Sequence, residues 1–406
     1  GADKGHIGCM FNYALRLFKG EGVSSDKEEA SKYFKQAAEE GDPNAMYFYA
    51  YMLGKGEGVP PDFDESIEFY KKACEKGQID AMFEYGLMLF KGEKVPMDRE
   101  EAKKLFKKSA DKGEVRSMLA LSFMLENENN AESKEEAAKY FKMAADKGDS
   151  NAMYNYAMIC KQKCKNKDFC YYLKKAADKG QSDAVYNYAC MLVCGDGIPV
   201  NKKEAARYFR ISIDKFNNVD SMNNLAWMLK NGDGIPVDLK EAAKFFKMAA
   251  DQGNESAMNN YACMLKTGEG VDVDKQMAVH YYKLAIDKGF PDAMQNYASM
   301  LAIGDGVEKN KEEAEKFYKM ATDTGDKKAF FTKALRLLNG VGQPQNIEEG
   351  HKFLKMAADK GEVEAMNLYA NDLFNGNGIK QNKEEAIKYI KMAADLGNLD
   401  SVYNYA

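Results

Sequence analysis

"NESAMNNYACMLKTGEGVDVDKQMAVHYYKLAIDKG", residues 254–289, contains one complete structural unit. Its first half carries apolar residues at the i, i+3, i+4 and i+7 spacing of an amphipathic helix, namely Met258, Tyr261, Ala262 and Leu265. Its second half carries a similar stripe, namely Ala278, Tyr281, Tyr282 and Ala285. Gly268 and Gly270 lie between the stripes, where glycine favours a helix end because it readily takes the left-handed conformation. The unit is therefore predicted to be a helix, a turn and a second helix.

This unit recurs along the whole chain. Glycines that close the second helix stand at 5, 41, 77, 113, 148, 180, 253, 289, 325, 361 and 397, and Phe216 fills the one remaining slot. The usual interval is 36 residues, and the unit at 149–180 is about four residues shorter than this period. A two-helix unit of this size cannot bury its own apolar faces, so neighbouring units must stack to form a core. The sequence predicts an all-α solenoid of about eleven 36-residue helix-turn-helix repeats.

We expect a single continuous solenoid over residues 1–406, with a shortened, irregular repeat at 149–180. The chain begins with "GADKG", which reads as the tail of a second helix, and stops at "SVYNYA", within a first helix. A solenoid needs polar capping repeats at its ends. Both ends are thus cut within a repeat, and we expect a fragment of a longer protein.

A capping signal precedes the second helix in most units. An Asp, Asn or Ser stands three residues before a Glu, which is the capping-box pattern, in nine pairs: Asp26/Glu29, Asp62/Glu65, Asp98/Glu101, Ser133/Glu136, Asn201/Glu204, Asp238/Glu241, Asn310/Glu313, Asn346/Glu349 and Asn382/Glu385. Their regular place at helix starts indicates a structural role and argues against catalytic carboxylate pairs.

Taken together, the pattern A-M-x-x-Y-A-x-M-L-x-x-G-x-G-V followed by D-x-x-E-A-x-x-Y-F-K-x-A-A-x-x-G resembles the Sel-1-like repeat (SLR), a relative of the tetratricopeptide (TPR) repeat. The resemblance covers essentially the whole chain. One departure is Tyr-Ala, as at Tyr261-Ala262, where many such repeats have Leu-Gly. The resemblance implies a right-handed superhelix with the first helices on its concave side. It also implies an adaptor that assembles protein complexes, and not an enzyme.

Composition limits the classes of partner. The formal net charge is −5, which gives no basic surface for nucleic acid. No run of about 18 apolar residues occurs, so we expect no membrane insertion. The eight cysteines do not recur at fixed repeat positions, which is typical of free thiols in a reducing compartment, and we expect a cytoplasmic protein. The partner class that remains is a protein or peptide, and we expect the chain to act within a large complex.

Catalytic and cofactor motifs are missing from the pattern. The Gly-x-Gly pairs lack a preceding strand and a following Gly-Lys-Ser/Thr, so they predict turns and no nucleotide site. His6, His280 and His351 stand far apart, with no patterned nucleophile. One cluster, Cys160, Cys164, Cys190 and Cys194, has i, i+4 spacing on two first helices and could form a zinc site. Because the usual C-x₂-C spacing is absent, we expect buried packing cysteines, no metal and no cofactor.

The candidate binding residues lie on the first helices. Projected at 100° per residue, Asn223, Asn224 and Trp227 share the helix face opposite the core residues Leu225 and Leu229. Two following units repeat this polar face, and the Asn slot recurs earlier in the chain. The predicted partner-binding set is Asn187, Asn223, Asn224, Trp227, Asn259, Asn260, Gln295 and Asn296.

Two interpretations of these asparagines remain open. An Asn side chain can pair with the backbone N–H and C=O of a peptide, so one Asn per repeat would form a ladder along an extended partner segment in the concave groove. Alternatively, each Asn bonds a neighbouring helix and sets the curvature of the superhelix. At the level of function, the competing hypotheses are a structural spacer in a large or cytoskeletal assembly, using the convex face and the ends, and a regulatory arm of an enzyme such as a kinase.

Overall fold

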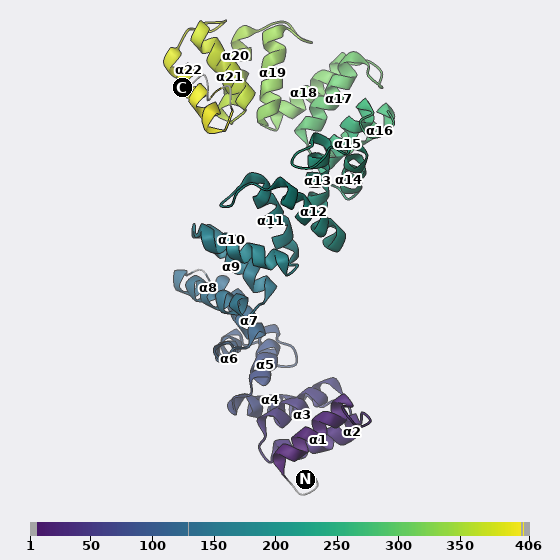
Figure 1. Ribbon diagram of the computed structural model, residues 1–406, viewed down its shortest axis with the longest axis vertical. Helices are drawn as coiled ribbons and strands as arrows, with labels where there is room; N and C mark the ends of the chain where they lie inside the picture. The colour runs from purple at the N-terminus through teal and green to yellow at the C-terminus, as the bar shows by residue number, and fades with distance from the viewer. Residues whose placement is uncertain (1–5, 129, 399–400, 402–406) are drawn as a thin grey trace. The chain divides into compact units, whose positions relative to one another are not determined.

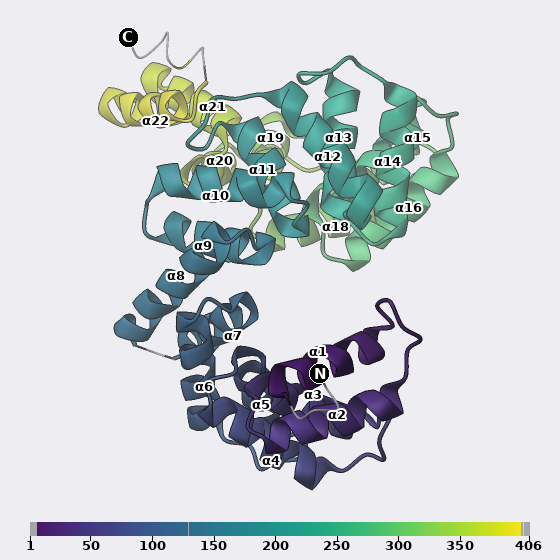
Figure 2. The same ribbon diagram turned by 60° about the horizontal axis from the view of Figure 1, so that its bottom comes forward.

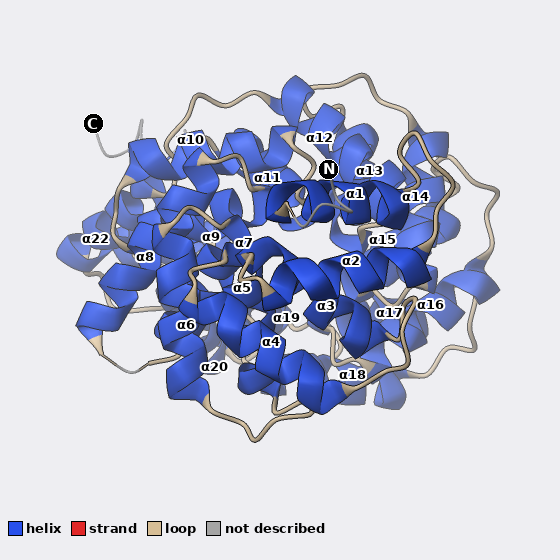
Figure 3. Ribbon diagram, turned by 90° about the horizontal axis from the view of Figure 1, so that it is seen from below, coloured by secondary structure: helices blue, strands red, loops and turns tan. Residues whose placement is uncertain are grey.

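The computed structural model describes residues 6–128, 130–398 and 401. These residues form 22 α-helices joined by loops, without a strand in the described ranges (Figures 1 and 3). The helices are α1 (Ile7–Lys19), α2 (Lys27–Glu39), α3 (Pro43–Lys55), α4 (Phe63–Glu75), α5 (Ile79–Lys91), α6 (Arg99–Asp111), α7 (Val115–Glu126), α8 (Ala131–Asp146), α9 (Ser150–Gln162), α10 (Asn166–Asp178), α11 (Ser182–Cys194), α12 (Lys202–Phe216), α13 (Val219–Asn231), α14 (Leu239–Asp251), α15 (Glu255–Thr267), α16 (Lys275–Asp287), α17 (Pro291–Ile303), α18 (Lys311–Asp323), α19 (Lys327–Asn339), α20 (Ile347–Asp359), α21 (Val363–Asn375) and α22 (Lys383–Asp395). The predicted all-α fold of about eleven two-helix repeats is confirmed.

Each odd-numbered helix is the first helix of a repeat, and the next even-numbered helix is its second helix. The chain divides into two compact units, Gly1–Tyr188 and Ala189–Ala406. In the first unit, consecutive helices from α1 to α10 pack against each other, and in the second unit consecutive helices from α12 to α22 do the same (Figure 2). The prediction of one continuous solenoid across both units stays a prediction.

The core of each unit is built from small residues beside large aromatic ones. The paired alanines, such as Ala37 with Ala38 and Ala249 with Ala250, are almost fully buried, as their role in close helix packing requires. Three residues before the paired alanines, or before the equivalent positions where that pair is altered, the second helix buries a large side chain in most repeats. It is aromatic at Phe34, Phe106, Phe141, Phe209, Phe246 and Tyr282, and leucine at Leu173 and Leu354. Most repeats thus contribute small residues and one large side chain to a core that continues into the neighbouring repeat.

The two glycines of a Gly-x-Gly turn have different structural roles. The first glycine is the left-handed C-cap of the first helix: Gly56 has φ 69° and its N–H bonds the Met52 carbonyl. The second glycine permits a close approach to the preceding repeat, because a Cβ on Gly58 would lie 2.2 Å from the Lys27 carbonyl oxygen. Gly270 is in the same position, 2.2 Å from the Leu239 oxygen. Only glycine fits where the turn packs on the start of the preceding second helix.

A capping box has two reciprocal hydrogen bonds, and in the box of Asp238 and Glu241 only one of them forms. The Asp238 carboxylate accepts a hydrogen bond from the Glu241 N–H at 2.9 Å, as predicted. The Asp238 N–H, however, donates to the Leu229 carbonyl at 3.0 Å, so it does not need the Glu241 side chain. The Glu241 carboxylate pairs instead with Arg210 of the preceding repeat, with both N···O distances at 2.7 Å. The same inter-repeat pairing recurs as Lys35–Glu65, Lys107–Glu136 and Lys355–Glu385.

Three local predictions were wrong. Ser133 is not the N-cap of its helix, because α8 begins three residues earlier and the Asn130 side chain accepts the Ser133 N–H at 2.7 Å. Phe216 does not replace the closing glycine, because it ends α12 and Asn217 takes the left-handed conformation. Cys164 is not helical, because residues 163–165 form the shortened connection between α9 and α10, where Cys164 has φ 55°.

Candidate partner-binding surface of the first helices

Trp227 is the most accessible of the predicted binding residues. It lies on α13 and is 50% exposed, although both neighbours in the sequence, Ala226 and Met228, are buried. Asn223 and Asn224, on the same helix, are half-buried. An exposed tryptophan on an otherwise well-packed helix presents a large apolar surface to a partner.

The predicted asparagines contact one another between repeats. Asn260 on α15 donates to Asn223 on α13 at 3.5 Å, and Asn296 on α17 donates to Asn259 on α15 at 2.8 Å. Asn259 is only 6% exposed, so its amide is largely withdrawn from a partner. These are the contacts that the neighbouring-helix interpretation describes, and binding of a peptide backbone by these amides stays a prediction. Gln295 is half-buried beside them.

The same two slots meet at two places in the first unit, with different chemistry. One slot is the first residue after the methionine of the apolar stripe, and the other is the second residue after that methionine. The first slot of one repeat lies against the second slot of the next repeat. Asn187 donates to the Tyr154 hydroxyl at 3.0 Å, and the Phe11 and Phe48 rings lie 5.9 Å apart. This lateral contact joins consecutive first helices by amide pairs, by aromatic pairs or by a mixed pair.

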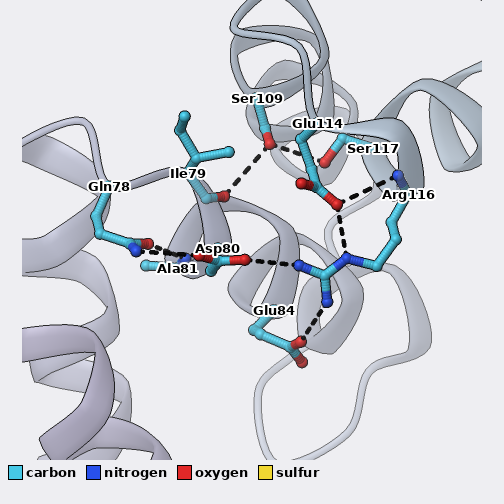
Figure 4. A network of polar contacts seen from close by, with 9 residues as sticks. All are labelled: Gln78, Ile79, Asp80, Ala81, Glu84, Ser109, Glu114, Arg116 and Ser117. Atoms are coloured by element: carbon cyan, nitrogen blue, oxygen red, sulfur yellow. Dashed lines mark hydrogen bonds and ion pairs between the residues drawn. The ribbon is translucent and has the colours of Figure 1, made fainter. Parts of the chain in front are cut away.

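Figure 4 shows a polar junction between the third and fourth repeats. Arg116, at the start of α7, donates to Asp80 at 2.7 Å and to Glu84 at 3.4 Å on α5, and to Glu114 at 2.6 Å. Its guanidinium carbon lies 4.4 Å from the centre of the Phe83 ring. Arg116 therefore bridges three carboxylates, of which its single charge offsets one, and fixes α7 against α5.

A second apolar feature of the first helices is the position that Trp227 occupies, five residues after the stripe methionine. We name it the surface slot, and its residues are Leu15, Tyr51, Leu87, Phe123, Met158, Cys190, Trp227, Cys263, Ser299, Leu335 and Asn371. Among the described residues none of these is buried. In the first unit all five members are apolar, so the first helices there present a run of apolar side chains, one per repeat.

Two pockets open along this run. A pocket of about 270 Å³ lies between α3, α4 and α5, lined by Tyr51, Phe63 and Leu87 among others. A pocket of about 540 Å³ lies between α5, α6 and α7, lined by Leu87, Phe90 and Phe123 among others. Leu87 lines both, so the pockets are neighbours one repeat apart.

These pockets were missed by the sequence reasoning, which centred the binding surface on Trp227. Leu87 and Phe123 share the surface slot with Trp227, and that shared position was the available signal. The depth of the pockets depends on how the turns of the third and fourth repeats pack, which no helix period reports.

The cysteine cluster shows no metal geometry. Cys160 is buried, Cys164 and Cys194 are exposed, and Cys190 is intermediate. Within the described part of the chain, no group of three or more His, Cys, Asp or Glu side chains is arranged to hold a metal ion. None of the described helices is long and apolar enough to cross a membrane.

Comparison with known proteins agrees with this architecture. The Sel1 repeat model matches residues 7–42, 43–78, 79–114, 116–149, 170–181, 182–215, 219–254, 255–290, 291–326, 334–362 and 363–398. The structure of c5321, a protective antigen of uropathogenic Escherichia coli with an SLR fold, is 23% identical and has a TM-score of 0.77, covering 100% of this chain and 88% of that one. A Sel1 repeat protein from Oxalobacter formigenes is 18% identical with a TM-score of 0.42, covering 96% and 91%. Comparison with curated protein sequences finds no match.

Proposed function

The chain belongs to the Sel1 repeat family, and on that premise we propose that it is a non-enzymatic scaffold that binds an extended segment of a partner protein along its first helices. Repeats of the Sel1 and TPR type generally mediate contacts between proteins. The observation that carries the proposal is the run of uncovered apolar residues in the surface slot, with Phe123 45% and Trp227 50% exposed. Exposed aromatic side chains on a rigid surface are where binding energy concentrates.

The spacing of the repeats fits an extended chain. Packed helices lie roughly 8–10 Å apart, and an extended peptide advances about 3.3 Å per residue. A surface slot of one repeat would therefore contact about every third residue of the partner. In this arrangement the lateral Asn pairs hold the first helices in register, and the surface slots supply the contacts.

The competing hypothesis of a structural spacer uses the second helices and can be separated by two matched substitutions. Trp227 on α13 and Met277 on α16 are both exposed apolar residues of the second unit, at 50% and 43%. We expect Trp227→Ala to reduce recovery of the bound partner in affinity purification at least fivefold, while Met277→Ala retains it. A spacer would give the reverse pattern. Circular dichroism of both variants controls for folding.

We propose a reducing, cytoplasmic location, because the eight cysteines do not recur at fixed repeat positions. Fractionation of cells expressing the tagged full-length protein tests this expectation, and recovery in the secreted fraction would contradict it.

A further inference from the structure

The third and fourth repeats both depart from the Gly-x-Gly sequence of the turn, as does the shortened fifth repeat. In the third repeat Lys94 occupies the place of the second glycine and has φ 65°. In the fourth repeat α7 ends at Glu126 and α8 begins at Ala131, so the Gly-x-Gly turn is replaced by an extra helical turn. Both departures lie in the first unit, beside the two pockets.

The packing of the glycine turns explains why these departures matter. At Gly58, Gly234 and Gly270 the second glycine approaches the preceding second helix so closely that a Cβ would lie 2.2 Å from its backbone or side chain. Lys94 has a Cβ and cannot make that approach. Its ammonium group lies 3.0 Å from the centre of the Phe63 ring, at the edge of the smaller pocket.

The fourth repeat provides the comparison within the molecule. Where Glu93 and Lys94 help to close the smaller pocket, the equivalent turn is absent over α6, and the pocket there is about 540 Å³ against about 270 Å³. Among the described residues of the connection between α7 and α8, Asn127 and Glu128 line the larger pocket. Pockets of about 610 Å³ and 620 Å³ also lie beside glycine turns, over α12 and α2, so the size of a pocket does not follow from the turn alone. The two pockets at α5 differ from these because Leu87 lines both, which places them next to each other.

The charges around the two pockets favour an acidic ligand. Three of the four lining carboxylates already pair with cations: Glu84 with Arg116, Glu93 with Lys91, and Glu128 with Lys103. Within the described residues, Lys55, Lys94 and Arg99 make no ion pair, and Glu100 is the one unpaired carboxylate among the lining residues. The lining residues comprise five cations and four carboxylates, so the two pockets together carry a charge of +1 in a chain of net charge −5.

We infer that these two neighbouring pockets form one docking site, which takes an acidic, extended peptide with two bulky apolar side chains about three residues apart. One apolar side chain enters between α3, α4 and α5, and the other enters between α5, α6 and α7. Asp or Glu residues beside them pair with Lys55, Lys94 and Arg99. The inference rests on the proposed scaffold function and names the chemistry of its partner.

A filling variant tests the site without removing any contact. Ala120 lines the larger pocket, and the equivalent position of the second repeat is Phe48, so the fold already accommodates phenylalanine at this slot. Ala120→Phe is therefore expected to fold and to block the pocket. Thr332→Phe places the same side chain at the same slot of the tenth repeat, which keeps its glycine turn at Gly340 and Gly342, and serves as the matched control.

The probe is a displayed library of random 12-residue peptides selected on the immobilised 406-residue chain, followed by fluorescence anisotropy with the selected peptides. We expect enrichment of two bulky apolar residues two or three positions apart, with adjacent Asp or Glu. Ala120→Phe should weaken these peptides at least tenfold, Lys94→Glu with Arg99→Glu should weaken them at least fivefold, and Thr332→Phe should leave the Kd within twofold of the unsubstituted chain.

The opposite outcomes separate this inference from the function on which it rests. Peptides that bind Ala120→Phe with unchanged Kd, or a consensus rich in Lys and Arg, would overturn the inference. If those peptides then lose affinity in Trp227→Ala, the scaffold function stands and its site lies in the second unit. A library that yields no saturable binder would overturn both.

Discussion

Asn296 shows what one side chain does at the residue scale. Its amide donates at 2.8 Å to Asn259, whose side chain is nearly buried. Removing the donor leaves a buried amide oxygen without its partner, which costs about 1–3 kcal/mol. We expect Asn296→Ala to lower the free energy of unfolding by about this amount in urea denaturation.

Asn155 is the matched control for this prediction. It occupies the same slot in the fifth repeat, but its amide bonds only the Asn151 carbonyl of its own helix, at 3.0 Å. Asn155→Ala should change the free energy of unfolding by less than about 0.5 kcal/mol. Equal losses in the two variants would show that the lateral pair contributes nothing, and would favour amides held available for a ligand.

Glycine positions give a second residue-scale prediction. Gly270 and Gly289 both have positive φ, 74° and 81°, but only Gly270 would place a Cβ within 4 Å of a neighbour. Alanine at either position pays the left-handed strain of about 1–2 kcal/mol. We expect Gly270→Ala to lose about 1–3 kcal/mol more than Gly289→Ala, because the turn must also move off α14. Equal unfolding midpoints for the two variants would contradict the close approach.

At the scale of elements, the second helices are tied together by charge as well as by packing. The hydrogen bond from Arg210 holds the pKa of Glu241 below its ordinary value of about 4.3. A carboxylate with a depressed folded pKa stabilises the fold above its unfolded pKa, and this stability is lost as the pH falls through the folded pKa. The contribution is small, about 0.5–1 kcal/mol, because both side chains are partly exposed.

The substitution Arg210→Met keeps the apolar stem and removes the charge. We expect it to lower the free energy of unfolding at pH 7 by about 0.5–1 kcal/mol and to have a smaller effect as the pH falls below about 4.3. Urea denaturation of both chains at several pH values measures the difference. A loss of stability that is the same at pH 3 and pH 7 would mean that packing, and not the ion pair, accounts for it.

The elements also mark where sequence patterns stop being informative. A capping acceptor three residues before Glu predicted the starts of most second helices, because that bond is local. The Glu side chains, however, form ion pairs with the preceding repeat: Glu241 with Arg210 and Glu136 with Lys107. These partners lie about 30 positions away in the sequence, and no local motif encodes them. The start of α8 was missed for a related reason: Asn130 and Ser133 are both good caps, and the missing glycine turn allows the longer helix.

At the scale of the molecule, the 36-residue period was enough to predict the repeat architecture. Apolar stripes, closing glycines and paired alanines all derive from one requirement, that each repeat bury its faces against the next. The candidate site was less predictable. Trp227 stood out as the one tryptophan, whereas the pockets beside Leu87 and Phe123 depend on how side chains from three helices pack together, which no sequence pattern encodes.

The measurement that tests the account most directly is site-specific photo-crosslinking within the first unit. Phe123 on the first helix α7 and Tyr171 on the second helix α10 are both exposed aromatic residues, at 45% and 52%. Each is replaced in turn by benzoylphenylalanine, and the chain is irradiated with its bound partner and analysed by mass spectrometry. The account predicts a cross-link from position 123 and none from position 171. Cross-links from position 171 alone would contradict binding along the first helices.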